Sequence, residues 1–460
     1  MLALVLLALY ASNAAWALSL AGSGASAASL KLVDSAATEL RQYFWNIDLQ
    51  TKDRMEKILT LYERERIDAS CFHGVNGYGH GDIGREKLDA IIASLMGAEA
   101  ALVRLQLFSG THAIASALFG CLRPGNTMLC VSGHPYDTME EVIGQRPGSQ
   151  TGTLTGSLID WNIKYKELEL LYKQDAKKVS GLDVAFDLPA IDMALAEDPS
   201  IKLVHVQRSC GYSWRPSIPI KEIKRLCDHM QANHKSKGRD VVVFVDNCYG
   251  ELVEAQEPCH VGADIIAGSL IKNLGGTLAP CGGYVAGKKK YVDAATVHLS
   301  APGVDGGATF SQYRSLFQGL FMAPSIVGES LKGAELVAEV MQNKLGFPCN
   351  PPPRSSRTDI IQAVQLGSRE KVVSFCESVQ KRSPVGGYIR PIPGHSPGYG
   401  DEVIFADGTF IDGSTLELSA DGPLREPYVV FTQGATHWTH WGLVLEEMLK
   451  RPAFSAIVPR

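Results

Sequence analysis

One lysine stands out for the chemistry that its surroundings would give it. Lys272 lies in GSLIKNLGG, between the apolar run ADIIAGSLI and two glycines, and no other charged residue occurs between Asp264 and Lys288. Because burial disfavours the charged form of an amine, we expect Lys272 to have a lowered pKa. A neutral lysine amine can form a Schiff base with an aldehyde, so the residue is a candidate nucleophile.

Other residues suited to chemistry follow strand-like segments or open helical ones. Asp246 ends the β-branched run DVVVFVDN, where a buried carboxylate is costly unless it pairs with a cation or a protonated ring nitrogen. Ser109, Gly110 and Thr111 open an apolar helical segment, so backbone N–H groups and two hydroxyls could bind a phosphate. Tyr136, in HPYDT, could stack on a flat cofactor. Together these are the parts that pyridoxal phosphate requires.

Each of these residues also has an ordinary explanation, and the sequence leaves those alternatives open. An Asp at a strand end is often a helix cap, a Ser before a helix is often an N-cap, and a lysine in apolar surroundings often extends to solvent. His437 and His440 have the spacing of a metal pair, but no third ligand is evident and aromatic packing is favoured. Cys210 and Cys248 lie near the same strand ends, where packing is favoured over reactivity.

The elements that must position these residues alternate in a regular way. Residues 31–100 have helical spacing, and residues 101–310 alternate apolar runs with helical segments. That alternation predicts an α/β fold in which a mostly parallel sheet is covered on both faces. Ligands bind beyond the carboxyl ends of such strands, where the candidate residues stand. GGYVAGKKKYV predicts an added hairpin, and residues 311–460 predict a bridging helix followed by a smaller α+β domain.

Composition excludes several classes of protein. The chain has 460 residues, 45% of them hydrophobic, and a net charge of -5, which suits a soluble protein of two domains and not a nucleic-acid binder. Its ten cysteines form no C-x-x-C pair, so we expect neither a zinc site nor a disulfide framework, and predict no metal. Residues 1–30 contain no Lys, Arg, Asp or Glu; we interpret them as a targeting remnant or a disordered start, in a cytoplasmic or plastid protein. No later run is long enough to span a bilayer.

Long motifs, in this order, carry a resemblance to a known family. They are VRLQLFSGTHAIASALFGCLRPGN, GHPYDTMEEVIG, VQRSCGYSWRPS, FVDNCYGELVE, AGSLIKNLGGTLAPCGGYVAG and LELSADGPLREPYVVFTQG. From about residue 40 to residue 445 the chain resembles the methionine gamma-lyase-like family, also called the aluminium-resistance family. That family belongs to the fold-type I pyridoxal-phosphate enzymes of cysteine and methionine metabolism, so the resemblance implies an aspartate aminotransferase-like large domain.

The resemblance implies a role for each candidate residue. Lys272 would bear the cofactor, Asp246 would face its pyridine nitrogen, and Tyr136 would stack on the ring and donate a proton. The other cofactor-binding residues that it implies are Ser109, Gly110, Thr111 and Ser269 around the phosphate and, from a neighbouring subunit, Tyr78. Because Tyr78 would serve another copy of the chain, a homodimer or homotetramer is implied.

The activity that the resemblance implies is that of a carbon–sulfur lyase acting on a sulfur-containing amino acid, by alpha,gamma- or alpha,beta-elimination to a thiol, a 2-oxo acid and ammonia. Arg425 would bind the substrate carboxylate, and Lys272 would move the Cα proton. Ile271 stands where the better-known lyases usually have a hydroxyl residue, so the specificity for sulfur stays open. The alternatives are a transaminase, an aldolase or decarboxylase, or a non-catalytic protein that binds pyridoxal phosphate or metal and is linked to aluminium resistance.

Overall fold

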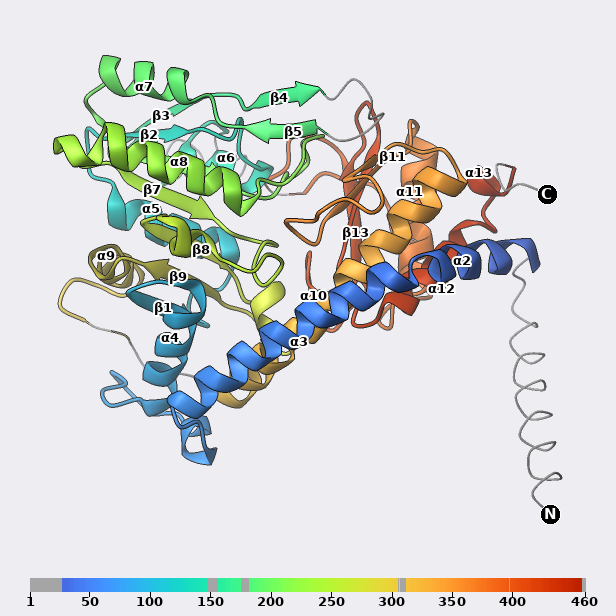
Figure 1. Ribbon diagram of the computed structural model, residues 1–460, viewed down its shortest axis with the longest axis horizontal. Coiled ribbons are helices and arrows are strands. Elements are labelled where there is room, and N and C mark those ends of the chain that lie inside the picture. Colours follow the sequence, from blue (N-terminus) through green and yellow to red (C-terminus); the bar gives the residue numbers. More distant parts are fainter. Residues whose placement is uncertain are drawn as a thin grey trace.

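The structure, a computed structural model, describes residues 27–146, 156–174, 182–304, 306, 312–396 and 398–456. Two lobes, each built on its own β-sheet, are joined by long helices (Figure 1). The predicted targeting segment, residues 1–30, lies outside the described residues as far as residue 26, and helix α2 (Ala27–Glu39) follows directly. Across the described ranges, every helix is too short or too polar for a bilayer crossing.

The larger lobe contains a sheet of seven strands in the order β1-β9-β8-β7-β6-β2-β3. The strands are β1 (Ala100–Arg104), β2 (Thr127–Cys130), β3 (Lys164–Glu167), β6 (Ile201–Gln207), β7 (Val242–Asp246), β8 (Ile265–Ser269) and β9 (Gly283–Gly287). Only β9 runs against the others, antiparallel to β1 and β8. Every residue of β7 and β8 is buried, as the continuous apolar runs in the sequence predict. The predicted α/β fold with a mostly parallel sheet is confirmed.

Helices cover both faces of this sheet, because successive side chains of a strand point to opposite faces. Val242 and Phe244 belong to one core and Val243 and Val245 to the other. The first core is covered by α5 (Gly110–Cys121), α6 (Asp137–Ile143) and α9 (Lys289–Leu299). The second core is covered by α4 (Ile83–Met96), α7 (Leu188–Glu197) and α8 (Ile220–Asn233).

The predicted hairpin in GGYVAGKKKYV is wrong. The segment forms one strand, β9, which is inserted between β1 and β8 and bonds to both, and the chain then enters α9 without a second strand. Val292 and Ala295 of α9 are buried three residues apart, a helical spacing that the three preceding lysines conceal in the sequence. The lysines at 288–290 therefore begin a helix.

The smaller lobe is built on an antiparallel sheet of five strands in the order β10-β11-β14-β13-β12. They are β10 (Cys349–Asn350), β11 (Gln362–Gln365), β12 (Val403–Ala406), β13 (Ser419–Pro423) and β14 (Val429–Gln433). Its apolar core includes side chains of α2, α11 (Arg369–Lys381), α12 (Trp438–Met448) and α13 (Pro452–Ser455). A separate pair, β4 (Leu171–Gln174) and β5 (Leu182–Ala185), extends from the larger lobe. Short single turns complete the described chain: η1 (Ala69–Phe72), η2 (Ile159–Trp161), η3 (Lys235–Lys237), η4 (Pro258–Val261), η5 (Asn273–Gly275) and the π-turn η6 (Glu339–Lys344).

Two long helices, α3 (Arg41–Arg64) and α10 (Tyr313–Ala338), lie side by side along both lobes (Figure 1). The backbone of α10 packs directly on the turn that follows Lys272. A Cβ atom on Gly319 would lie only 2.2 Å from the carbonyl oxygen of Gly275, and one on Gly276 would lie 2.0 Å from the carbonyl oxygen of Gly319. The two glycines after Lys272 therefore let a helix and a loop touch without side chains, which fixes where that loop lies.

This contact predicts the effect of one added methyl group. Gly319→Ala should lower the free energy of unfolding by about 1–3 kcal/mol, because the methyl group overpacks a backbone contact. Gly442→Ala is the matched control: it is also a buried helical glycine, but its nearest new neighbour would be 3.8 Å away, so we expect a gain of about 0.5–1 kcal/mol. Urea and thermal denaturation of both variants measure the difference. Equal effects would contradict the packing argument.

Candidate active site

Three parallel strands of the large sheet end side by side at the boundary with the smaller lobe. β6, β7 and β8 finish at Gln207, Asp246 and Ser269, and the register pairs Gln207 with Asp246 and Asp246 with Ala267. Polar side chains therefore meet at one edge, where α/β proteins bind ligands. Phe431 of β14 belongs to a small apolar cluster that joins the two lobes here.

Asp246 is a buried carboxylate, and no arginine or lysine of the described residues forms an ion pair with it. It is 4% exposed, and its Oδ1 accepts a hydrogen bond from the backbone N–H of Cys248 at 3.1 Å. Burial raises the pKa of Asp246, an effect that the Cys248 N–H and the Lys272 amine oppose. The ionised form of such a carboxylate is stabilised by a cation or an N–H donor that comes close to it.

Lys272 follows β8 after a short link, and its amine lies over an aromatic ring. Nζ is 3.7 Å from the centroid of the Tyr249 ring, a cation–π contact. Asn273 fastens the loop, since its Nδ2 donates to the backbone carbonyls of Tyr249 at 3.0 Å and of Glu251 at 2.8 Å. Tyr249 therefore contacts the amine through its ring and the lysine loop through its carbonyl. It is a site residue that the sequence pattern did not indicate.

The expectation of a lowered pKa for Lys272 is wrong for the chain described here. Burial lowers the pKa of this amine, but Tyr249, Cys248 and Tyr136 raise it, and the result lies above the ordinary value. The apolar pattern around Lys272 predicts burial, and the residue is partly buried. Tyr249 and Cys248 belong to a different loop, so their effect on its pKa is not visible in that pattern.

The amino-terminal end of α5 faces the end of β8. Ser109 caps this helix, because its Oγ accepts a hydrogen bond from the His112 N–H at 3.1 Å, and its hydroxyl hydrogen is left to donate elsewhere. A Cβ atom on Gly110 would lie 3.0 Å from the Cβ of Ser269, so a glycine allows the close approach of helix and strand. The hydroxyls and the first N–H groups of α5, which have no intrahelical partner, form a set of donors suited to an anion.

Tyr136 stands between this helix and the sheet edge. Its backbone N–H donates to Oε1 of Gln207 at 2.7 Å, and its phenol oxygen lies 3.0 Å from Oγ1 of Thr111. Burial, with a contribution from Asp246, raises the pKa of Tyr136, so the phenol keeps its proton at neutral pH. The structure thus brings together Ser109, Gly110, Thr111, Tyr136, Asp246, Ser269 and Lys272.

Asp421 of the smaller lobe also lies near Lys272, although the sequence analysis did not single it out. It is 7% exposed on β13, and its Oδ2 accepts a hydrogen bond from Oγ of Ser414 at 2.9 Å. Burial raises the pKa of Asp421 to about 6, and the Lys272 amine opposes that rise. The Leu416 N–H donates to the carbonyl oxygen of Ile271 at 3.2 Å, so the smaller lobe reaches the lysine loop. Asp421 is an acidic residue within the strand SADGP, whose residues are all buried. That position is the feature of the sequence by which it could have been found.

Two predicted residues lie away from this group. Arg425, in the turn after β13, has a half-exposed side chain that forms an ion pair with Asp401. Tyr78 is 65% exposed and stacks on His80, with ring centroids 5.9 Å apart, in the loop before α4. Within the described residues no hydrogen bond or ring contact joins either side chain to the Lys272 group, so their roles stay predictions.

The histidine pair and the two thiols noted in the sequence have structural partners. His437 caps α12, whereas Nε2 of His440 lies 2.8 Å from the carbonyl oxygen of Arg382, so the two rings serve different contacts. Burial raises the pKa of Cys210 to about 12 and that of Cys248 well above its usual value. The structure therefore favours the packing interpretation for both thiols.

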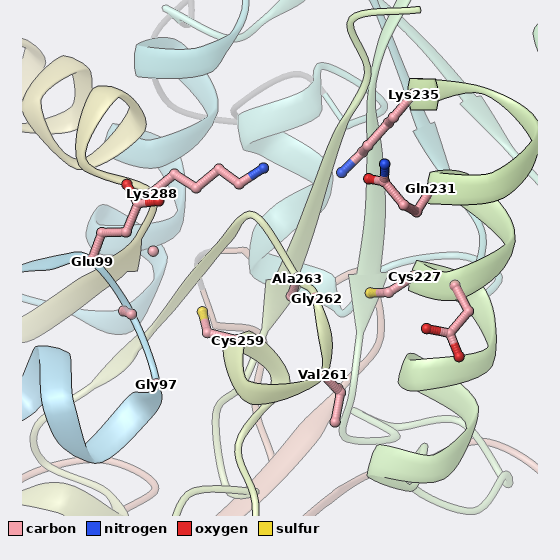
Figure 2. A pocket seen from close by; sticks show the side chains of 13 residues that line it. Gly97, Glu99, Cys227, Gln231, Lys235, Cys259, Val261, Gly262, Ala263 and Lys288 are labelled. Carbon is pink, nitrogen blue, oxygen red and sulfur yellow. The ribbon is translucent and has the colours of Figure 1, made fainter. Parts of the chain in front are cut away.

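A pocket of about 310 Å³ lies at the opposite edge of the sheet (Figure 2). Lys235 and Lys288, which line it, both form ion pairs with Asp264, the residue before β8. Because β8 runs from that end to Ser269, the pocket is separated from Lys272 by the length of the strand. Its two lysines already share one carboxylate, and the pocket contains none of the residues singled out for chemistry in the sequence.

Comparison with known proteins agrees with this geometry. A family model described as methionine gamma-lyase matches residues 29–453. The uncharacterized protein YnbB of Bacillus subtilis is 43% identical over 416 residues, which are 89% of this chain and 94% of that protein.

Solved structures extend the comparison. A candidate cystathionine beta-lyase involved in aluminum resistance from Clostridium acetobutylicum has a TM-score of 0.84 and 41% identity, over 92% of this chain and 96% of that chain. A carbon-sulfur lyase involved in aluminum resistance from Clostridium novyi has a TM-score of 0.83 and 42% identity, over 93% and 96%. The pyridoxal-5'-phosphate dependent protein YhfS of Escherichia coli, at 17% identity and a TM-score of 0.57, shares the fold alone.

These matches cover nearly the whole described chain, including both lobes and the edge at which Lys272 and Asp246 meet. The fold is that of the fold-type I pyridoxal-phosphate enzymes. The family resemblance seen in the sequence motifs is confirmed: the chain belongs to the methionine gamma-lyase family.

Proposed function

We propose that this protein is a pyridoxal-phosphate-dependent carbon–sulfur lyase that acts on a small sulfur-containing amino acid. One observation carries the proposal: the amine of Lys272, the buried carboxylate of Asp246 and the amino-terminal end of α5 meet at one edge of one sheet. Membership of the methionine gamma-lyase family supports the reaction class. The products would be a thiol, a 2-oxo acid and ammonia, from elimination at Cγ or at Cβ.

The donor set fits pyridoxal phosphate. Lys272 would hold the aldehyde carbon, and Asp246 would hold the ring nitrogen, since a buried carboxylate favours a protonated partner. Tyr136 would lie against the ring. The phosphate would take the hydroxyls of Ser109, Thr111 and Ser269 and the first N–H groups of α5, where Gly110 leaves room that a Cβ atom would fill.

The chain's own residues divide the proton transfers between them. Bound pyridoxal phosphate supplies an aldehyde that condenses with amines and a ring that accepts electron density. The Lys272 amine, once neutral, can remove the Cα proton of the substrate and return it. The phenol of Tyr136 keeps its proton at neutral pH because burial raises its pKa, and it can donate that proton to the departing sulfur. Both lobes contact the loop that carries Lys272, which would limit access of water once substrate is bound.

The remaining assignments are also part of the proposal. We propose a homodimer or homotetramer in which the exposed ring of Tyr78 reaches the phosphate of a neighbouring copy. Arg425 would bind the substrate carboxylate only after it leaves Asp401. The relatives named above are bacterial, so they favour a cytoplasmic location and lend no support to the plastid alternative.

Lys272→Arg tests the bond to the cofactor. Arginine keeps the positive charge over Tyr249 but does not condense with an aldehyde, so the variant should lack the absorption band at about 420 nm that marks lysine-bound pyridoxal phosphate. Its turnover should fall by roughly 10²–10⁴-fold, because the proton carrier is lost. Lys289→Arg, on an exposed lysine of α9, is the matched control and should keep the band. A band that survives in Lys272→Arg would contradict the assignment.

Asp246→Asn tests the buried carboxylate. The amide keeps the shape and the hydrogen bond from the Cys248 N–H but removes the negative charge, so kcat/KM should fall by about 10²–10³-fold. Asp359→Asn is the control, because Asp359 is equally buried and accepts a hydrogen bond from Ser209 at 2.8 Å. Steady-state kinetics compare the two variants. Equal losses of activity in both variants would contradict a specific role for the charge of Asp246.

The reaction class is tested with a panel of amino acids that carry sulfur on Cβ or on Cγ. We expect thiol, 2-oxo acid and ammonia in equal amounts from at least one of them, and none from Lys272→Arg. A thiol reagent, hydrazone formation and an ammonia assay measure the three products. Release of 2-oxo acid without thiol would favour a transaminase, and no product from the whole panel would remove the lyase proposal.

A further inference from the structure

Three side chains, two on covering helices of the large sheet and one just after the end of α8, converge on one point far from Lys272 in the fold. Oδ1 of Asp192, on α7, lies 2.8 Å from Nε2 of His229 and 2.6 Å from Nε2 of His234. The three ligand atoms all lie within 4.8 Å of one another. We propose that Asp192, His229 and His234 form a binding site for a divalent metal ion, with Zn²⁺ as the ion that fits best.

The ligand types and spacing suit that ion. Imidazole nitrogen and carboxylate oxygen are usual zinc ligands, at metal–ligand distances of about 2.0–2.2 Å, and a tetrahedral site then separates its ligand atoms by roughly 3.3 Å. The present separations of 2.6 and 2.8 Å need to open by about 0.5–0.7 Å. Asp192 is partly exposed, with 42% of its side chain accessible, so water can complete the coordination.

The two imidazole rings are already held in orientation. The side chains of His229 and His234 are only 17% and 13% exposed, and their ring planes are inclined at 58° with centroids 6.1 Å apart. The Asn233 amide lies on the far side of one ring, with Nδ2 3.0 Å from Nδ1 of His229. When a metal takes Nε2, Nδ1 carries the proton, and the amide can turn its oxygen to accept it, as outer partners of metal-bound histidines do.

The local backbone explains why the sequence conceals this site. His229 and His234 are five residues apart, a spacing that does not place two side chains on one face of a helix. α8 ends at Asn233, and His234 leaves the helix with φ -124° and ψ -62°, which returns its ring towards His229. From the cysteines and the His437–His440 pair the sequence predicts no metal site, so the present proposal departs from that expectation.

The position of the site indicates a structural role. α8 follows β6 and precedes β7, so it runs from the carboxyl edge of the sheet to the opposite edge, and the two histidines lie at its end. A metal ion here would tie α7 to α8 across the surface of the larger lobe. It would therefore stabilise that lobe without taking part in the proposed reaction, and the proposal does not depend on the lyase assignment.

Zinc titration of the full-length chain, after treatment with a chelator, tests the proposal. Calorimetry should give one Zn²⁺ bound per chain, and the midpoint of thermal unfolding should rise with zinc concentration, because the ion binds the folded state. His234→Gln and Asp192→Asn should each weaken binding by at least about 10-fold. His437→Gln, at an exposed histidine outside the cluster, is the matched control and should bind as the wild type does.

Anomalous diffraction at the zinc edge, on crystals of the wild type, makes the test independent of how the variants fold. The expected result is a peak between Asp192, His229 and His234. No bound zinc, zinc bound only at cysteine thiols, or unchanged affinity in both cluster variants would each overturn the proposal.

Discussion

A buried carboxylate next to a partly buried amine is the constraint on which the rest of the site depends. Asp246 is almost fully buried at the end of β7, and the Lys272 amine lies close enough to lower its pKa. Removing one charged group from water costs several kcal/mol unless another group compensates for it. The structure compensates only in part, with one backbone N–H for the carboxylate and an aromatic ring for the amine. A site of this kind gains stability when a ligand brings the complementary charges.

The surrounding fold holds these two groups in a fixed relation. The lysine loop is fastened on one side by Asn273 and on the other by the bare backbone of α10 at Gly319. The second lobe adds a backbone hydrogen bond to Ile271 and a buried acid, Asp421. Since both lobes contact the same short loop, a change in how they pack would move the amine. Rigid support of this kind is what precise proton transfer requires.

Much of this arrangement could be predicted from the sequence, for a physical reason. Apolar runs that alternate with helical segments imply a parallel sheet, and the rule that ligands sit at the carboxyl ends of its strands places Asp246 and the residues around Lys272 together. The first inference needs only local patterns of apolar residues, and the second needs only one general rule about where parallel sheets bind ligands. The family motifs then add the cofactor and the reaction class, which periodicity alone does not give.

What could not be predicted depends on contacts between distant segments. β9 pairs with β1 on one side and with β8 on the other. The sequence of a single antiparallel strand does not show which segments are its partners, so a hairpin is a reasonable but wrong prediction. The raised pKa of Lys272 comes from Tyr249 and Cys248, which lie on another loop. The meeting of Asp192 with His229 and His234 requires the end of α8 to turn back. None of these features has a signature within one short stretch of sequence.

The central claim is that Lys272 is the residue that binds the aldehyde of pyridoxal phosphate. It is tested most directly by reducing the loaded wild-type protein with borohydride, which makes that linkage permanent, and then mapping the modified peptide by mass spectrometry. The account predicts one modification per chain, on the peptide that contains Lys272. Modification of a different lysine, or no stable modification at all, would contradict it.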